Sequence, residues 1–204
     1  MSAGTTTPTT PPCSVAAVPD SPAAWWGPEM RALALATAAA AVQVFATPAF
    51  SATPEALRPE SGLQAVLTLH AVGSQIYECA KNAQDSWAWQ FKQPQAELFD
   101  EMGHQIGQHG AGPSWTLNDG SSLVGQMQAS APAPAAGAIP WLLLGVRSRS
   151  GSGRLDGVAA IQRLSTQGGV APTADRCHAA TAGQIAKVAY SADYTFWAPA
   201  GSRP

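Results

Sequence analysis

The feature that most constrains the fold of this chain is a period of two in its hydrophobic pattern from residue 63 onward. Residues 63–70, 123–129 and 190–196 alternate apolar with more polar side chains, and turns rich in Gly, Pro, Asn and Asp separate these segments. Alternation of this kind is typical of strands that are buried on one face. No segment carries three turns of an amphipathic helix. The sequence therefore predicts an all-β domain, a single antiparallel β-sandwich or barrel of about 8–10 short strands.

The turn signals divide this pattern into individual strands. A turn is expected at Ala71–Ser74, because it contains a glycine, and Pro94 is expected to end the strand that carries Trp87, Trp89 and Phe91. Residues 131–138 read as a linker-like loop, and Ile139–Val146 is so evenly apolar that a central strand is predicted. Residues 158–164 fit a strand or a helix. The expected strands are residues 63–70, 75–79, 87–92, 96–99, 104–109, 115–117, 123–129, 139–146 and 190–196.

Residues 30–51 have the pattern of a secretory signal peptide. Met30 is followed by Arg31, an uncharged run from Ala32 to Ala46, and small residues around a cleavage site after Ser51. The apolar run is about 15 residues long and falls short of the roughly 20 that span a bilayer. Residues 1–29 are interpreted as an over-extended reading frame or as a disordered extension. We therefore expect residues 52–204 to form one secreted or periplasmic all-β domain, with no membrane contact after cleavage.

Cleavage at this position would leave two of the three cysteines. Cys13 would be lost, and Cys79 and Cys177 would remain in an oxidising compartment. Two cysteines in an exported domain are most simply a disulfide. The alternative is a reactive thiol, which requires a surrounding that lowers the thiol pKa.

Six segments in a fixed order carry a resemblance to a known family. They are LTLHAVGSQIYEC, the aromatic WAW, AELFDEMGHQIGQHGAGPSWTLNDGSSLVG, AIPWLLL, GRLDGVAAIQRLSTQGGVAP before Cys177, and YSADYTFW. This order resembles the exported family of unknown function numbered 3455, from about Pro54 to Trp197. The resemblance implies export but no established activity, although some relatives carry a malate dehydrogenase label.

Composition and motifs do not favour that label. A dehydrogenase needs a glycine-rich turn between a strand and a helix, and residues 151–157 have GxGxxxG spacing in a chain without strand–helix alternation. A hairpin loop is the preferred interpretation, and no cofactor is expected. Charged residues make up 12% of the chain, the net charge is −2, and basic residues are scattered. Nucleic-acid binding is therefore not expected.

The candidate site residues are histidines and one tryptophan. His104 and His109 flank the motif HQIGQHGAGPSW, and Trp115 next to it is our candidate for a pocket edge. On a regular strand His104 and His109 would point to opposite faces. A metal site would need a third ligand such as His70, Asp100 or Glu101. The simpler alternative is that these histidines form hydrogen bonds at a strand end, and Trp87, Trp89 and Phe91 are expected in the core.

Two functional hypotheses follow. The first is a non-catalytic module that binds an unknown small ligand or a cell-envelope component through His104, His109 and Trp115. The second is a small secreted enzyme, with or without a metal ion, that uses these histidines together with His70. Convergence of His70, His104 and His109 on one concave surface would favour the second hypothesis.

Overall fold

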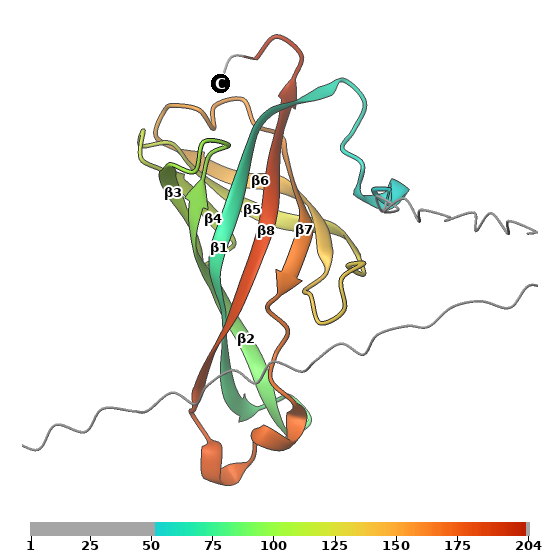
Figure 1. Ribbon diagram of the computed structural model, residues 1–204, viewed down its shortest axis with the longest axis vertical. Coiled ribbons are helices and arrows are strands. Elements are labelled where there is room, and N and C mark those ends of the chain that lie inside the picture. Colours follow the sequence, from blue (N-terminus) through green and yellow to red (C-terminus); the bar gives the residue numbers. More distant parts are fainter. Residues whose placement is uncertain (1–51, 203–204) are drawn as a thin grey trace, which may run out of the picture. The chain divides into compact units, whose positions relative to one another are not determined.

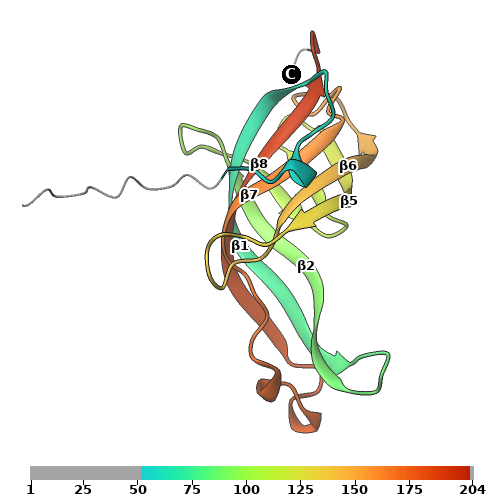
Figure 2. The same cartoon turned by 90° about the vertical axis from the view of Figure 1, so that its right-hand side faces the viewer.

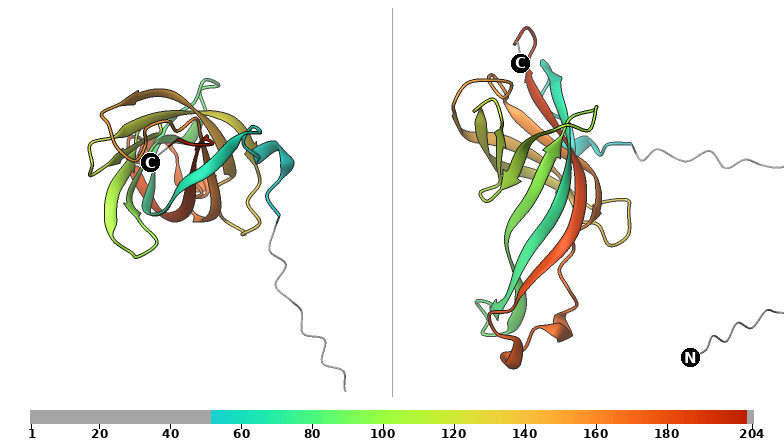
Figure 3. Two further views of the ribbon diagram at one scale, coloured as in Figure 1. Left: turned by 90° about the horizontal axis from the view of Figure 1, so that it is seen from above. Right: turned by 60° about the vertical axis from the view of Figure 1, so that its left-hand side comes forward.

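The computed structural model describes residues 52–202, which fold into one closed antiparallel barrel. The predicted signal peptide, the upstream extension and Cys13 lie outside the described residues. Each strand pairs with the next along the chain, and β1 also pairs with β8, so that the sheet closes on itself (Figure 1, Figure 3). The strands are β1 Leu63–Lys81, β2 Trp87–Phe99, β3 Gln105–Gly110, β4 Ser114–Leu117, β5 Ser122–Ala131, β6 Trp141–Ser150, β7 Ala160–Gly168 and β8 Ile185–Pro199.

The prediction of an all-β domain is confirmed, and the barrel alternative describes its form. The helices of residues 52–202 are three short 3-10 turns, η1 Glu55–Leu57, η2 Ala174–Arg176 and η3 Ala179–Thr181. None of them has the length and apolar character needed to cross a bilayer. Residues 151–157 lie in the loop between β6 and β7, as the hairpin interpretation expected. The ambiguous segment 158–164 belongs largely to strand β7.

Three strands extend past the barrel, and the predicted break in the first of them is wrong. Residues 75–78 of β1 pair with both β2 and β8, and residues 79–81 pair with β2 alone. Because β2 pairs with β3 only from Ala96 and β8 pairs with β7 only from Tyr190, these three strands form an extension of the sheet (Figure 2). The predicted turn at Ala71–Ser74 is instead the middle of β1. A Cβ on Gly73 would clash with the Gln95 carbonyl oxygen of β2. The glycine therefore serves the close approach of two strands rather than a turn.

Pro94 also lies inside a strand, contrary to the expectation that it ends one. Strand β2 runs through Pro94, which pairs with Gln75 of β1. The pairing of β2 with β3 begins only at Ala96. Proline lacks an N–H group and is tolerated where one edge of a strand has no neighbour. The missing β3 partner on this edge explains why β2 continues through the proline.

The barrel interior is filled with side chains and is closed at one end. Strand residues that face inward alternate along every strand, and the β6–β7 loop adds Leu155 and Val158, both fully buried. Trp115 of β4 lies in the centre, and a Cβ on Gly125 would come within 2.9 Å of its ring. Glycine at this position therefore makes room for the indole.

The β6–β7 loop is held over this end of the barrel by Asp119. The Asp119 carboxylate accepts hydrogen bonds from the Ser121 hydroxyl at 2.6 Å and from the Arg154 backbone N–H at 2.8 Å.

A second apolar cluster covers part of the outer surface. Leu57 of η1 is fully buried against Trp141, Leu143 and Ala160, and its carbonyl accepts a hydrogen bond of 2.6 Å from Gln162. Strand β6 is consequently buried on both faces, which explains its nearly continuous apolar sequence. The strand begins two residues later than Ile139 and continues to Ser150.

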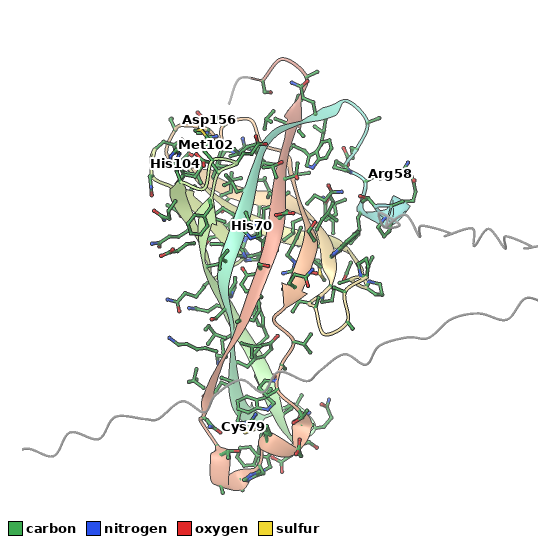
Figure 4. The ribbon with its side chains drawn as sticks, viewed as in Figure 1. Arg58, His70, Cys79, Met102, His104 and Asp156 are labelled. Carbon is green, nitrogen blue, oxygen red and sulfur yellow. A yellow bond between two sulfur atoms is a disulfide. The ribbon has the colours of Figure 1, made fainter. Side chains whose placement is uncertain are left out.

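The predicted disulfide is present at the far end of the extension. Cys79 of β1 and Cys177, just after η2, are bonded with their Cα atoms 5.3 Å apart. The β7–β8 connection is also held there by backbone bonds from Gly183 N–H to the Cys79 carbonyl and from Cys79 N–H to the Gln184 carbonyl, at 2.8 and 2.9 Å. The disulfide thus fastens the longest connection of the domain to the three extended strands (Figure 4).

Candidate functional site

The end of the barrel opposite the β6–β7 loop is open and forms a hollow of about 570 Å³, which we call the mouth pocket. Its volume lies within the range of small-molecule sites in proteins. The extended part of β1 and β2 makes one wall, and the β3–β4 and β5–β6 connections make the rim. Its apolar lining comes from Phe91, Pro113, Met127, Ile139, Leu142 and Leu144, and its polar lining includes Gln75, Tyr77, His109, Ser130 and Arg163.

The rim carries large apolar side chains that are accessible to solvent. Phe91 is 53% exposed and Met127 is 62% exposed, and both line the mouth pocket. Phe91 also packs edge-on against Tyr77, with ring centroids 5.6 Å apart. Exposed apolar side chains that border a hollow, rather than lying scattered, are typical of binding sites.

His109 forms the inner wall and its tautomer follows from its two partners. Its Nδ1 lies 2.8 Å from the Ser114 carbonyl oxygen, which can only accept, so Nδ1 carries the proton. Nε2 is then an acceptor and receives the hydroxyl proton of Tyr194 at 3.0 Å. The imidazole also stacks on Trp115 with centroids 4.7 Å apart. His109 is therefore held in one orientation and in one protonation state.

Burial keeps His109 and the neighbouring tyrosines neutral at pH 7. Burial, with the nearby Arg163 charge added, lowers the pKa of His109 to about 4, although the hydrogen bond to Ser114 opposes the shift. Burial likewise raises the pKa of Tyr77, Tyr190 and Tyr194, and Arg163 opposes each of these shifts. The charge of Arg163, which lines the pocket, thus acts to lower the pKa of His109 and of all three tyrosines.

This burial predicts a specific pH dependence of stability. An unfolded histidine has a pKa of about 6.5, so the unfolded chain binds a proton at His109 between about pH 6.5 and 4 while the folded chain does not. Folding free energy from this group is fully present above pH 6.5 and is lost as the pH falls to about 4. The loss should amount to about 3 kcal/mol.

The measurement is denaturant unfolding of the wild type and of His109→Gln between pH 7 and pH 4. The glutamine does not titrate, so the wild-type stability should fall about 3 kcal/mol more than that of the variant over this interval. Parallel pH profiles for the two proteins would contradict the buried neutral histidine.

Arg163 is a cation inside the barrel mouth without an acidic partner. It follows Ile161 on the inner face of β7, and its Nε and Nη2 donate to the Pro140 carbonyl at 3.2 and 2.7 Å. Within residues 52–202 none of the ion pairs involves Arg163.

Gln75 is an unpaired donor in the same pocket. It is 2% exposed, and its Nε2 has no hydrogen-bond partner among the described residues. Buried donors of this kind cost about 1–3 kcal/mol when unpaired.

The predicted grouping of His104 with His109 and Trp115 does not form. His104 is exposed in the β2–β3 turn, where its Nδ1 lies 3.3 Å from Asp100, at the opposite end of the barrel from the mouth pocket (Figure 4). His109 lines the pocket, and Trp115 lies behind it, fully buried, rather than at the pocket edge. A role of these three residues in ligand binding stays a prediction.

The three histidines of the metal-assisted hypothesis lie in three separate surroundings. His70 of β1 and His104 in the β2–β3 turn lie far apart (Figure 4). The Nδ1 of His70 lies 2.8 Å from Asp193 of β8 on the outer face, whereas His109 faces the barrel interior. Within residues 52–202 no three His, Cys, Asp or Glu side chains are grouped so that they could hold a metal ion. The histidine cluster therefore does not form in this part of the chain.

The aromatic residues 87–91 of β2 do not lie in the core, contrary to the expectation. Trp87 and Trp89 are half-buried and Phe91 is exposed, because this part of β2 lies beyond the closed barrel. Trp89 donates to the Thr173 carbonyl at 3.2 Å, and Lys81 lies over the ring of Trp87 at 5.8 Å. These rings are hydrophobic, but they stay partly exposed because no second layer of the barrel packs against this part of β2.

Arg163 and Gln75 are the pocket residues that sequence reasoning missed. Both occupy positions of the apolar alternation: Arg163 follows Ile161 by two residues, and Gln75 continues the face of Leu69 and Ala71. A polar residue at an inward position of a strand is a usable signal, because burying it requires a partner.

Another hollow, of about 720 Å³, lies over β1, β2 and β3, and its lining includes Gln93, Gln95, Glu97, Gln108 and Thr116. All five of these side chains are exposed. It lacks the apolar surroundings that strengthen polar contacts by excluding water. The mouth pocket is therefore the better candidate site.

Comparison with known proteins gives one match. A family model described as a protein of unknown function, DUF3455, matches residues 59–198. No curated protein matches this chain. No solved structure matches it either.

Proposed function

This chain belongs to the DUF3455 family of proteins of unknown function, and we propose that its barrel binds a small, largely apolar molecule in the mouth pocket without transforming it. The observation that carries the proposal is the combination of exposed Phe91 and Met127 on the rim with a hollow of about 570 Å³ behind them. A ligand there would remove apolar surface from water and gain about 25 cal/mol for each Å² buried.

The protonation states of the inner wall support binding rather than catalysis. A general acid or base works best when its pKa lies near the working pH. The pKa of His109 is lowered to about 4 and that of Tyr194 is raised, in both cases mainly by burial. Both groups stay neutral, and their mutual hydrogen bond gives the pocket wall a fixed shape. A fixed wall favours recognition, because less entropy is lost when the ligand binds.

We place this binding domain outside the reducing cytosol, in the periplasm or beyond the cell. The Cys79–Cys177 disulfide supports this compartment, since disulfides persist in oxidising environments. The signal-peptide pattern of residues 30–51 points to the same compartment.

The test uses a neutral apolar fluorophore, N-phenyl-1-naphthylamine, titrated into the protein. We expect saturable binding with enhanced fluorescence, and at least fivefold weaker binding to Met127→Asn, which removes apolar surface from the rim. The matched control is Met102→Asn, because Met102 is equally a surface methionine, 77% exposed, but lies in the β2–β3 turn away from the pocket. Absence of saturable binding, or equal weakening by both substitutions, would overturn the proposal.

A further inference from the structure

The net charge of the mouth pocket is positive. Its lining contains two cations and no acidic residue. One of the cations, Lys92, is paired with Glu78 of β1, at 2.9 Å between Nζ and Oε2. The other, Arg163, lies on the inner face of β7 and has no carboxylate partner within residues 52–202. One positive charge therefore remains uncompensated in the pocket.

The inner part of the pocket also has a surplus of hydrogen-bond donors. A guanidinium carries five N–H groups, and the Pro140 carbonyl accepts two of those of Arg163. The amide nitrogen of Gln75 is buried without a partner among the described residues. The hydroxyl protons of Tyr77 and Tyr194 are already donated, to the Gly169 carbonyl at 2.7 Å and to His109 at 3.0 Å. The unused capacity is therefore mainly that of donors.

We propose that the ligand of the mouth pocket is an apolar molecule with one carboxylate group, which Arg163 binds and to which Gln75 donates a further hydrogen bond. This inference rests on the proposed function, since it concerns the ligand of the same pocket. The planar guanidinium fork matches a carboxylate in geometry. A single uncompensated positive charge is matched by a monoanion, and the apolar rim of Phe91 and Met127 accepts the remainder of the molecule.

A cationic or neutral ligand fits the same residues less well. A cation would lie beside Arg163 with no acidic residue in the pocket lining to offset the repulsion. An alcohol would satisfy at most part of the donor surplus and would leave the guanidinium charge unpaired. The carboxylate accepts several hydrogen bonds at once, and charge-assisted bonds are about twice as strong as neutral ones.

The test compares acids with alcohols of the same shape by isothermal titration calorimetry. Decanoate and 1-decanol supply a flexible chain, and 2-naphthoate and 2-naphthalenemethanol supply a flat ring. At pH 7 we expect the acid of at least one pair to bind at least tenfold more tightly than its alcohol. Arg163→Met should bring the ratio of acid to alcohol affinity close to one, since it removes the charge and approximately keeps the length of the side chain.

The control is Arg147→Met, which makes the same change at an exposed outward position of β6 and should leave the preference intact. Arg163→Lys and Gln75→Leu provide independent variants, and each should lower the ratio of acid to alcohol affinity severalfold. An acid preference that survives in Arg163→Met, or its absence in the wild type, would overturn the carboxylate inference. Should N-phenyl-1-naphthylamine, acids and alcohols all fail to bind the wild type, the proposed function itself would be wrong.

Discussion

Replacing both Cys79 and Cys177 with serine should lower the free energy of unfolding by about 4 kcal/mol. The two cysteines are 98 residues apart in sequence, and a cross-link that closes a loop of this length restricts the unfolded chain strongly. The folded structure should change little when the disulfide is removed, because pairing of β1 with β8 closes the barrel without help from the disulfide. Urea unfolding of the wild type and of the double variant at one pH gives the difference.

The same substitution should have a local effect on the β7–β8 connection. Residues 170–184 are tied to the extended strands by the disulfide, by the Trp89 indole and by two backbone bonds of Cys79, with Gly183 and Gln184. Hydrogen exchange should become fastest in this connection, whereas the amides of β3–β6 that exchange only through global unfolding should report the same loss of unfolding free energy as the urea experiment. Addition of a reducing agent to the wild type is the matched control and should reproduce both effects. A stability difference below about 1 kcal/mol would contradict the cross-link argument.

Trp115→Ala should cost about 3–5 kcal/mol, because truncating a fully buried tryptophan removes apolar contacts and leaves a cavity. The indole is surrounded by aromatic rings: His109 stacks on it, and Tyr194 and Phe196 meet it edge-on at 5.4 and 6.1 Å. Gly125 leaves room for the ring and supplies no side chain that could fill the space. The structure around Trp115 therefore has little means of collapsing onto the cavity.

Trp87→Ala is the matched control for this prediction. Trp87 is the same residue type but is half-buried on the extension, where Lys81 is its charged neighbour. Trp87→Ala should lower the free energy of unfolding by only about 1 kcal/mol, because a half-buried ring removes less apolar area from water. Equal losses for the two variants in urea unfolding would show that Trp115 does not have the central packing role assigned here.

The alternation along single strands predicted the fold class, because successive side chains of a strand point to opposite faces whatever the rest of the chain does. Residues 190–196 have the same inward face in the sequence pattern and in the barrel. Strand continuity was harder to predict. Gly73 and Pro94 resemble turn residues when they are considered alone, yet both lie inside strands because of what their neighbours require: one needs a close contact and the other lacks a partner on one edge.

The candidate site divides in the same way. The sequence by itself determined that His109 and Trp115 would lie close together, because only five residues, including a short turn, lie between them on paired strands. It also determined which two cysteines would pair, since only Cys79 and Cys177 follow the predicted signal peptide.

Only the tertiary structure decided which distant residues meet at the mouth pocket. Closure of the barrel through β1 and β8 brings Gln75, His109 and Arg163 from three strands to one open end. The same closure leaves His104 at the other end of the barrel, whereas the outward facing of His70 follows from the alternation within β1. The physical reason is that the facing of a side chain follows from its own strand, whereas its neighbours across the barrel depend on strand order and register, which are set by packing of the whole sheet.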